Sequence, residues 1–295
     1  MTQFAQAAAY GVVQGGLLAL VAVGFSLVWG IMNVINLSHG AFAVTGAYVA
    51  WLLNQHFGLD PFLAIPIVAV AMFGFGYVIQ RGLINLVVNA PIFLTLLLTF
   101  GLSLVILNIL QLLFTADDRT IDTSYASQSF VIGTVNVPYG RLAAFFLAVI
   151  ITFALAALMT RTRLGHAIGA TGMDRGAARL MGIRARHIYA VTFGIAAALA
   201  GVAGTMIATV GSFNPTTTPG QLTLDAFVIS VLGGLGNMYG ALAGGLVLGI
   251  AESIGGLLLT GTWVNAIAMA VLIATLIIRP SGLIGKAQYG GRVEV

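Results

Sequence analysis

The chain alternates between long uncharged stretches and short charged ones. No Asp, Glu, Lys or Arg precedes Asp60, and none occurs in windows 61–80, 82–116, 142–160, 188–224, 226–251 and 253–278. A helix needs about 20 apolar residues to cross a bilayer core, and most of these windows are long enough. Because backbone polar groups in lipid must be paired within the protein, continuous apolar runs predict membrane helices, whereas a membrane barrel would show short alternating segments.

We predict an all-α polytopic membrane protein with eight full or nearly full spans and one half-length element, Leu224–Leu235. The other segments are Tyr10–Trp29, Ala41–Gln55, Pro61–Gln80, Pro91–Phe114, Leu142–Thr160, Ile188–Val210, Ala241–Leu259 and Trp263–Ile278. Together they form one transmembrane domain over residues 1–295, with a polar loop at 115–140 and a basic loop at 161–187. The polar loop contains VIGTVNV, for which we expect a small hairpin.

The composition agrees with a lipid environment. The chain is 59% hydrophobic and only 7% charged, whereas about 25% of the residues of a soluble domain are charged. Glycine supplies 38 of the 295 residues. One interpretation is close packing of membrane helices, which glycine permits. The alternative is that some glycines mark helix breaks along a substrate path. The absence of cysteine excludes disulfides and thiolate metal sites. We expect no cofactor, no metal and no nucleic-acid partner.

The basic residues give an expected orientation, because Lys and Arg accumulate on the cytoplasmic side of a membrane. If the 161–187 loop is cytoplasmic, ten of the twelve basic residues lie inside, and only Arg119 and Arg141 lie outside. Asp225 and the aspartates of the 115–140 loop are then expected outside. We therefore predict an outer N-terminus and a cytoplasmic C-terminus.

The basic loop 161–187 is expected to hold a short helix with a signal at each end. The carboxylate of Asp174 is suited to cap the first-turn amides. Gly182 is suited to the left-handed position that follows a helix. Lipid headgroups are one expected contact for this positively charged loop.

The side chains between these two signals fall on two faces. Ala177, Ala178 and Met181 share one face by their spacing, and Arg175 and Arg179 lie four residues apart on another. Small apolar residues on a solvated helix favour a second interpretation of the loop, in which the helix is a knob that enters a groove on a partner protein.

Three motifs resemble those of branched-chain amino-acid ABC importer permeases, and of their high-affinity first-subunit class. The first is TRLG at 162–165 followed by DRGAARLMGI at 174–183 and ALAGVAGTM at 198–206. The second is INLSHGAFAVTGAYVA at 35–50, and the third is VLGGLGNMYGALAGGLVLGIAES at 231–253. In one respect the sequence differs from the family, because Gly176 occupies a position that is usually acidic.

The resemblance implies a type II ABC importer-like bundle in a bacterial inner membrane, working by alternating access. It implies a homologous second permease subunit, two cytoplasmic ATP-binding subunits and an extracytoplasmic solute-binding protein as partners. It also implies that the segment 174–182 couples the permease to the ATPases. The expected cargo is a branched-chain or other hydrophobic amino acid, with urea or short amides as the alternative.

The sequence lacks the motifs of an ATPase site and of an intramembrane enzyme, which is consistent with a permease that relies on separate ATP-binding subunits. An ATPase site needs G-x-x-x-x-G-K-[ST], but the only lysine is Lys286, in GLIGKA. No H-E-x-x-H motif is present, and with Asp225 expected outside no carboxylate pair lies in the membrane, so we expect no enzymatic activity. An ion-coupled secondary transporter using Glu252 is a further alternative; otherwise Glu252 orders a helix contact together with Gly236, Gly240 and Gly244.

The candidate translocation path combines two helix breaks and one polar face. Broken helices near the middle of a membrane expose amides and carbonyls that bind charged groups. The first break is 32–40, for which an ordinary cytoplasmic turn is the other interpretation, and the second follows the half-length element. The candidate residues are Asn33, Asn36, Ser38, His39, Gly40, Thr95, Thr99, Gly234 and Asn237.

Overall fold

The computed structural model describes residues 2–88, 90–123, 128–132, 135–259 and 263–284. Six helical spans in these ranges are long and apolar enough to cross a membrane. They are α1 (Thr2–Met32), α3 (Pro61–Ile79) with its continuation, α5 (Ile92–Phe114), α6 (Tyr139–Arg161), α9 (Ala185–Val210) and α11 (Met238–Leu259). A π-helical turn, η1 (Gln80–Ile84), and α4 (Asn85–Val87) continue α3.

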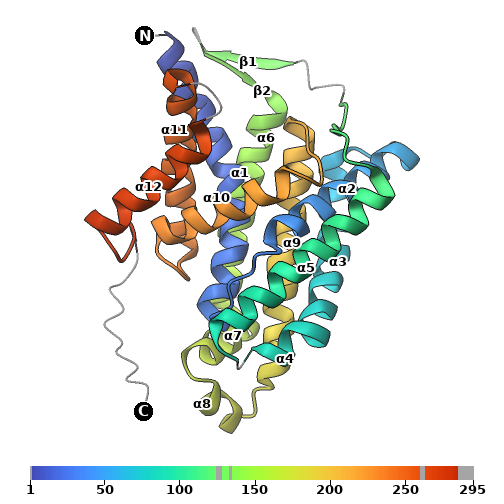
Figure 1. The fold of residues 1–295 in the computed structure, drawn as a ribbon, viewed down its shortest axis with the longest axis vertical. Helices are drawn as coiled ribbons and strands as arrows, with labels where there is room; N and C mark the ends of the chain where they lie inside the picture. Colours follow the sequence, from blue (N-terminus) through green and yellow to red (C-terminus); the bar gives the residue numbers. More distant parts are fainter. Residues whose placement is uncertain (1, 89, 124–127, 133–134, 260–262, 285–295) are drawn as a thin grey trace.

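Five further helices complete the described helical structure (Figure 1). They are α2 (His39–Phe57), α7 (Arg163–Met173), α8 (Arg175–Leu180), α10 (Thr218–Gly233) and α12 (Val264–Ile278). Every predicted membrane segment therefore coincides with a helix, and the prediction of an all-α polytopic fold is confirmed. α10 begins at Thr218, six residues before the predicted Leu224, so Asp225 lies inside the helix and not at its start.

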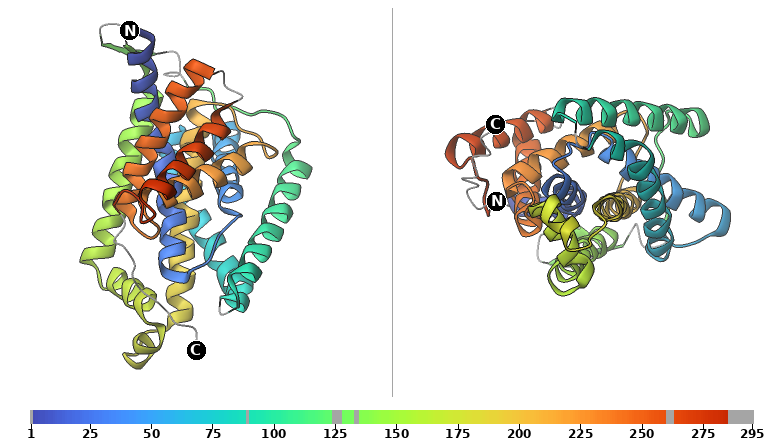
Figure 2. Two further views of the ribbon diagram at one scale, coloured as in Figure 1. Left: turned by 60° about the vertical axis from the view of Figure 1, so that its left-hand side comes forward. Right: turned by 90° about the horizontal axis from the view of Figure 1, so that it is seen from below.

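Helices α1 and α9 form the centre of the bundle. The most apolar windows of α1 and α9 are 83% and 78% buried, compared with 28% or less for α3, α5, α6 and α11. Seen end-on, α1 and α9 lie next to each other with the other helices around them (Figure 2). The outer helices expose large apolar side chains such as Leu112 and Phe93, which only lipid or another apolar surface can cover.

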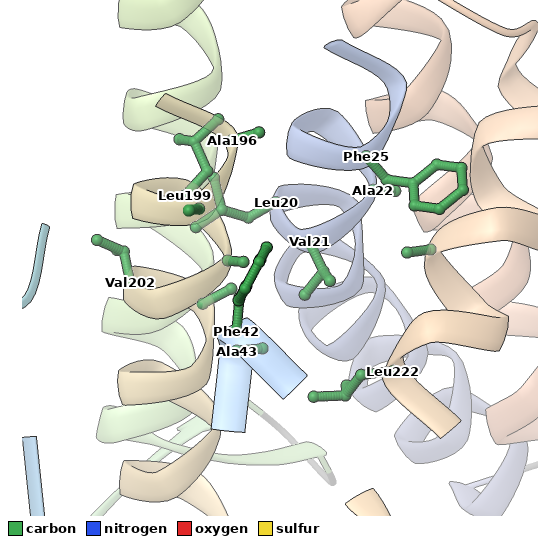
Figure 3. Packing of buried hydrophobic residues seen from close by; sticks show 14 of the residues in the cluster. Leu20, Val21, Ala22, Phe25, Phe42, Ala43, Ala196, Leu199, Val202 and Leu222 are labelled. Atoms are coloured by element: carbon green, nitrogen blue, oxygen red, sulfur yellow. The ribbon is translucent and has the colours of Figure 1, made fainter. Parts of the chain in front are cut away.

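The core between α1, α2 and α9 is built from tightly interlocked apolar side chains (Figure 3). Leu20 and Val21 of α1, Phe42 of α2 and Ala196 of α9 are all essentially inaccessible. Small residues bring α1 and α11 into backbone contact, because a Cβ atom at Gly11 would lie 2.6 Å from the Gly249 carbonyl oxygen. This agrees with the role of glycine in membrane helix packing.

The expected hairpin is present. β1 (Ser129–Ile132) and β2 (Val135–Pro138) pair antiparallel, with Phe130 opposite Val137. The Gln6 side chain both donates to the Asn136 carbonyl (2.7 Å) and accepts from the Asn136 amide (2.8 Å). The hairpin is therefore fixed to the first turns of α1, at the end of the bundle opposite α8 (Figure 1).

Candidate functional site

The first break separates α1 from α2. The imidazole Nε2 of His39, the first residue of α2, lies 2.9 Å from the Val21 carbonyl oxygen. Val21 precedes Met32, the last residue of α1, by eleven residues (32 − 21), which corresponds to about 16 Å along the helix at 1.5 Å per residue. The chain thus returns along α1 before α2 begins. Residues 33–38 form an internal break and not a turn at the helix end.

Most of the polar groups in this break are buried and bonded to one another. The Asn36 carboxamide oxygen accepts from the Ser38 amide (3.1 Å) and hydroxyl (2.6 Å). Asn36, Ser38 and His39 are each at most 1% exposed. Two buried atoms have no partner, the amide nitrogen Nδ2 of Asn36 and Nδ1 of His39. Because a carbonyl oxygen can only accept, Nε2 of His39 carries a proton and donates it to Val21, while Nδ1 has no hydrogen-bond partner.

The two predicted threonines of α5 behave differently. The Thr99 hydroxyl donates to the Ile35 carbonyl (2.9 Å) and accepts from the Leu37 amide (3.2 Å), so it ties α5 to the break. The Thr95 hydroxyl bonds the carbonyl of Ile92 in its own helix (2.7 Å). Of the two, only Thr99 bonds residues of the break.

The second break, at 234–237, joins α10 to α11 and contains two left-handed glycines. Gly234 and Gly236 have φ values of +99° and +82°, a region in which residues with a Cβ are strained. The Gly236 amide donates to the Ser26 hydroxyl of α1 (2.9 Å). The Asn237 carboxamide oxygen accepts from the Gly240 amide (3.0 Å), which caps the start of α11.

Helix α10 connects the two breaks. Near its beginning, the Thr223 hydroxyl accepts from the Gly40 amide (3.0 Å), in the first turn of α2 directly after the first break. Farther along, the Ser230 hydroxyl donates to the Ala22 carbonyl (3.2 Å) of α1, and α10 ends at the second break. Both breaks contact the same stretch of α1, from Val21 to Gly30. A displacement of α10 would therefore change both breaks together.

Not all the predicted path residues lie in one place. Asn33 is exposed, with φ +51°, where the chain leaves α1. Asn237 lines a cavity of about 620 Å³ between α6, α12 and the second break. Residues 36–40 do not line that cavity and are sealed within the bundle. The structure therefore brings Asn36, Ser38, His39, Gly40 and Thr99 together, and separates Asn33, Thr95 and Asn237 from them.

The expectation that no carboxylate pair lies among the membrane helices is wrong, because Asp225, which was expected outside, is buried in the bundle. Asp225 is on α10 and is 3% exposed, and Glu252, on the adjacent α11, is 9% exposed. Each has one carboxylate oxygen without a hydrogen-bond partner, and the two side chains interact electrostatically. The bundle thus contains a buried pair of acids. Buried acids are normally paired with Lys or Arg, and none pairs with these two among the described residues, so they are a functional candidate.

The glycines of α11 lie at close helix contacts. A Cβ atom at Gly244 would lie 2.8 Å from the Ile229 carbonyl oxygen, and one at Gly240 would overlap the Gly233 backbone. In the second break, a Cβ atom added to Gly236 would lie 3.1 Å from the Cα atom of Gly30 in α1. These contacts hold α10, α11 and α1 together around the second break.

The short helix α8 has both predicted end signals. The Asp174 carboxylate accepts from the Gly176 (2.7 Å) and Ala177 (3.0 Å) amides. Gly182 has φ +80°, and the amides of Gly182 and Ile183 donate to the Arg179 and Ala178 carbonyls. This pair of bonds is the Schellman arrangement that closes a helix. The helix has only six residues, so its ends determine whether it forms.

The predicted apolar face of α8 needs a correction. Ala178 is 4% exposed and packs into the protein, because it lies on the side of the helix that faces the bundle. Ala177 is exposed, and Met173, Leu180 and Met181 are each more than 80% exposed. The outward apolar tip therefore consists of Ala177, Met173, Leu180 and Met181. Arg175 and Arg179 belong to the same short helix.

Sequence reasoning missed the polar residues of α1 and α10 that contact the breaks, Ser26, Thr223 and Ser230. Each is a hydroxyl in a mainly apolar helix, where bonding to its own helix is the default expectation. Their partners lie 183 to 210 residues away in the chain. No local pattern signals such a contact.

Comparisons with known proteins agree with this architecture. Residues 7–278 match the family described as "Branched-chain amino acid transport system / permease component". The chain is 32% identical to the permease protein BraD of Pseudomonas aeruginosa and 30% identical to LivH of Salmonella typhimurium, over 94% of each chain in both cases. Both are described as high-affinity branched-chain amino acid transport system permeases.

Two more distant similarities were found. The chain is 27% identical to the ribose import permease protein RbsC of Escherichia coli, over 86% of this chain and 79% of that protein. Among solved structures, PsaBC from Streptococcus pneumoniae in complex with Fab is similar with a TM-score of 0.48 and 13% identity, covering 92% of each chain.

Proposed function

The chain belongs to the family of branched-chain amino acid transport permease components, and from this premise we propose that it is the membrane-spanning subunit of an ATP-binding-cassette importer. Separate subunits supply ATP hydrolysis, since the sequence contains no phosphate-binding loop. The observation that carries the proposal is the apolar tip of α8, a capped helix that projects from one end of the bundle (Figure 1).

The tip is suited to a protein partner. Leu180 and Met181 are 90% and 81% exposed at the end of a helix whose backbone is fixed by caps on both sides. A rigid apolar projection gains free energy when it enters a groove, because little conformational entropy is lost on binding. Lipid contact alone does not require such a fixed backbone.

A continuous set of contacts leads from α8 to the second break. α7, which precedes α8, packs against the end of α1, where a Cβ atom at Gly172 would lie 3.0 Å from Ile31 Cδ1. The adjacent Gly30 faces Gly236 in the second break. Movement of α7 and α8 by the ATPases would thus displace the end of α1 against this break, and α10 would pass the change to the first break.

The expected assembly follows from the family. It consists of this chain, a homologous second permease, two cytoplasmic ATP-binding subunits and an extracytoplasmic solute-binding protein in a bacterial inner membrane. The cytoplasmic side is the one that carries α8, so the N-terminus lies outside together with the hairpin. An epitope inserted after Gly58, at the other end of the bundle from α8, should be labelled in intact cells after permeabilisation of the outer membrane only.

The proposed cargo is a branched-chain or other hydrophobic amino acid. The relatives BraD and LivH are described as branched-chain amino acid permeases. The first break contains Asn36, Ser38 and His39 and no Asp, Glu, Lys or Arg, which suits a small zwitterion that passes without binding tightly. Urea and short amides are the alternative cargo within this family, and competition between labelled leucine and urea in uptake decides between them.

A second candidate function rests on the buried acids. Asp225 and Glu252 lack a basic hydrogen-bonding partner in the described part of the chain, which is the kind of site used by ion-coupled secondary transporters. This candidate predicts uptake by the chain alone under a proton gradient, with loss of uptake in Glu252→Gln. The ATP-driven proposal predicts neither result.

The coupling proposal is tested with Ala177→Trp. The bulky side chain replaces an exposed alanine, so the permease should fold and reach the membrane in normal amounts, but ATP-dependent uptake should be lost. Ala177→Ser, which keeps the small size, is the matched control and should retain uptake. Normal uptake in Ala177→Trp would contradict the docking role of α8. Ala178→Trp is unsuitable as a test because Ala178 is buried.

A further inference from the structure

A basic cleft lies beside α8, between the end of α3 and the beginning of α9. Its volume is about 630 Å³. Four arginines line it, Arg81, Arg179, Arg184 and Arg186, and no acidic side chain does so among the described residues. Four like charges around one cleft repel one another, so an anion bound there would be strongly favoured.

Hydrogen bonds fix part of the cleft wall. Arg81 donates from Nη1 to the Tyr77 hydroxyl oxygen (3.0 Å), and the same hydroxyl lies 3.1 Å from Nδ1 of His187. The Tyr77 hydroxyl therefore contacts both Arg81 and His187. The α3 and α9 walls of the cleft are thus held together.

The N-terminus of α9 adds a further positive contribution. Arg184 is the residue before the helix and makes no side-chain cap, and the first turn contains no acidic residue. The unpaired amides of a first turn and the helix dipole favour a negative charge there. Instead, Arg186 and His187 occupy that turn. This is an unfavourable placement of charge unless an external anion offsets it.

We propose that this cleft binds a phosphate group, supplied by the headgroup of an anionic phospholipid. The planar guanidinium groups of arginine match phosphate oxygens in bidentate pairs. Lipid is favoured as the source of the phosphate group because the residues that follow Arg81 expose apolar side chains suited to contact with acyl chains. Leu83 is 42% exposed and Leu86 is 77% exposed. Acyl chains along η1 and α4 would place the headgroup at Arg81. Such a lipid would join α3 to the loop that carries α8.

The test measures phospholipid retention by the purified permease. Wild type, the double variant Arg184→Gln/Arg186→Gln and the matched control Arg161→Gln/Arg163→Gln are mixed with phosphatidylglycerol or phosphatidylcholine and examined by native mass spectrometry. The control removes the same charge from the same end of the bundle, at exposed arginines that do not line the cleft. Titration with inorganic phosphate in place of lipid identifies the source of the phosphate group.

Wild type and the control should retain one phosphatidylglycerol in preference to phosphatidylcholine. The double variant should bind phosphatidylglycerol roughly thirtyfold more weakly. Two arginines near an anionic lipid contribute about 2 kcal/mol, and 1.4 kcal/mol corresponds to a tenfold change in affinity. Equal retention by all three proteins would overturn the proposal. Binding of inorganic phosphate as tight as that of lipid would keep the phosphate site but reject the lipid source. If the double variant lost ATPase binding but retained lipid normally, the cleft would be a protein-docking site and the proposal would be wrong.

Discussion

The substitution Gly182→Ala isolates the backbone energy that holds α8 in place. Gly182 has φ +80°, and no atom lies within 4 Å of where its Cβ would be. Steric overlap with neighbours is therefore absent, and the cost is that of a left-handed backbone for a residue with a Cβ, about 1–2 kcal/mol. Because α8 is short and held by its two ends, we expect this cost to appear as local opening of α8, with the bundle unaffected.

A loss of 1–2 kcal/mol raises the open population of α8 by a factor of about 5–30. Hydrogen exchange at the Gly182 and Ile183 amides, which close the helix, should accelerate by that factor. Gly169→Ala on α7 is the matched control, since Gly169 also has open space around its Cβ but a helical backbone. It should stabilise α7 by about 0.5–1 kcal/mol. Unchanged exchange in Gly182→Ala would refute the claim that the C-terminal glycine determines α8.

Three further results are expected. Thr99→Val should lower the free energy of unfolding in detergent by about 1–3 kcal/mol, because it leaves the partly buried Ile35 carbonyl and Leu37 amide without the Thr99 hydroxyl; Thr95→Val, whose hydroxyl bonds only its own helix, should cost less than about 0.5 kcal/mol. Gly249→Ala forces a Cβ against the α1 backbone and should cost about 1–3 kcal/mol in thermal unfolding, whereas Gly74→Ala, with open space, should not. Glu252→Gln should keep ATP-driven leucine uptake within about twofold, since a buried acid without a basic partner among the described residues is replaced by a neutral isostere; abolished uptake would favour ion coupling.

Local chemistry made much of the structure predictable. The apolar windows predicted nine helices, six of which are in spans long and apolar enough to cross a membrane, because lipid admits few alternatives for the backbone. Asp174 and Gly182 were identified as helix ends from residue type alone, and the structure has the hydrogen bonds and the φ value that they imply. The hairpin followed in the same way from a short apolar stretch in a polar loop. These features depend on neighbours within a few residues.

Features that depend on distant parts of the chain were not predictable. Ala177 and Ala178 are identical in type, and only packing of α8 against the bundle decides that Ala178 is the buried one. Asp225 was placed outside because the spans were taken to alternate from a cytoplasmic 161–187 loop, yet α10 starts earlier and buries it beside α11. The bond from His39 to Val21, which shows that the first break is internal, joins residues whose separation gives no sequence pattern.

The central claim is that this permease moves an amino acid with energy supplied by other subunits. The most direct measurement is uptake of labelled leucine into proteoliposomes that contain the chain, the second permease and the two ATPase subunits, with the solute-binding protein added outside. The account predicts uptake that requires ATP and all of these subunits and that persists when a protonophore collapses the proton gradient. Uptake by the chain alone, driven by a proton gradient and indifferent to ATP, would contradict it.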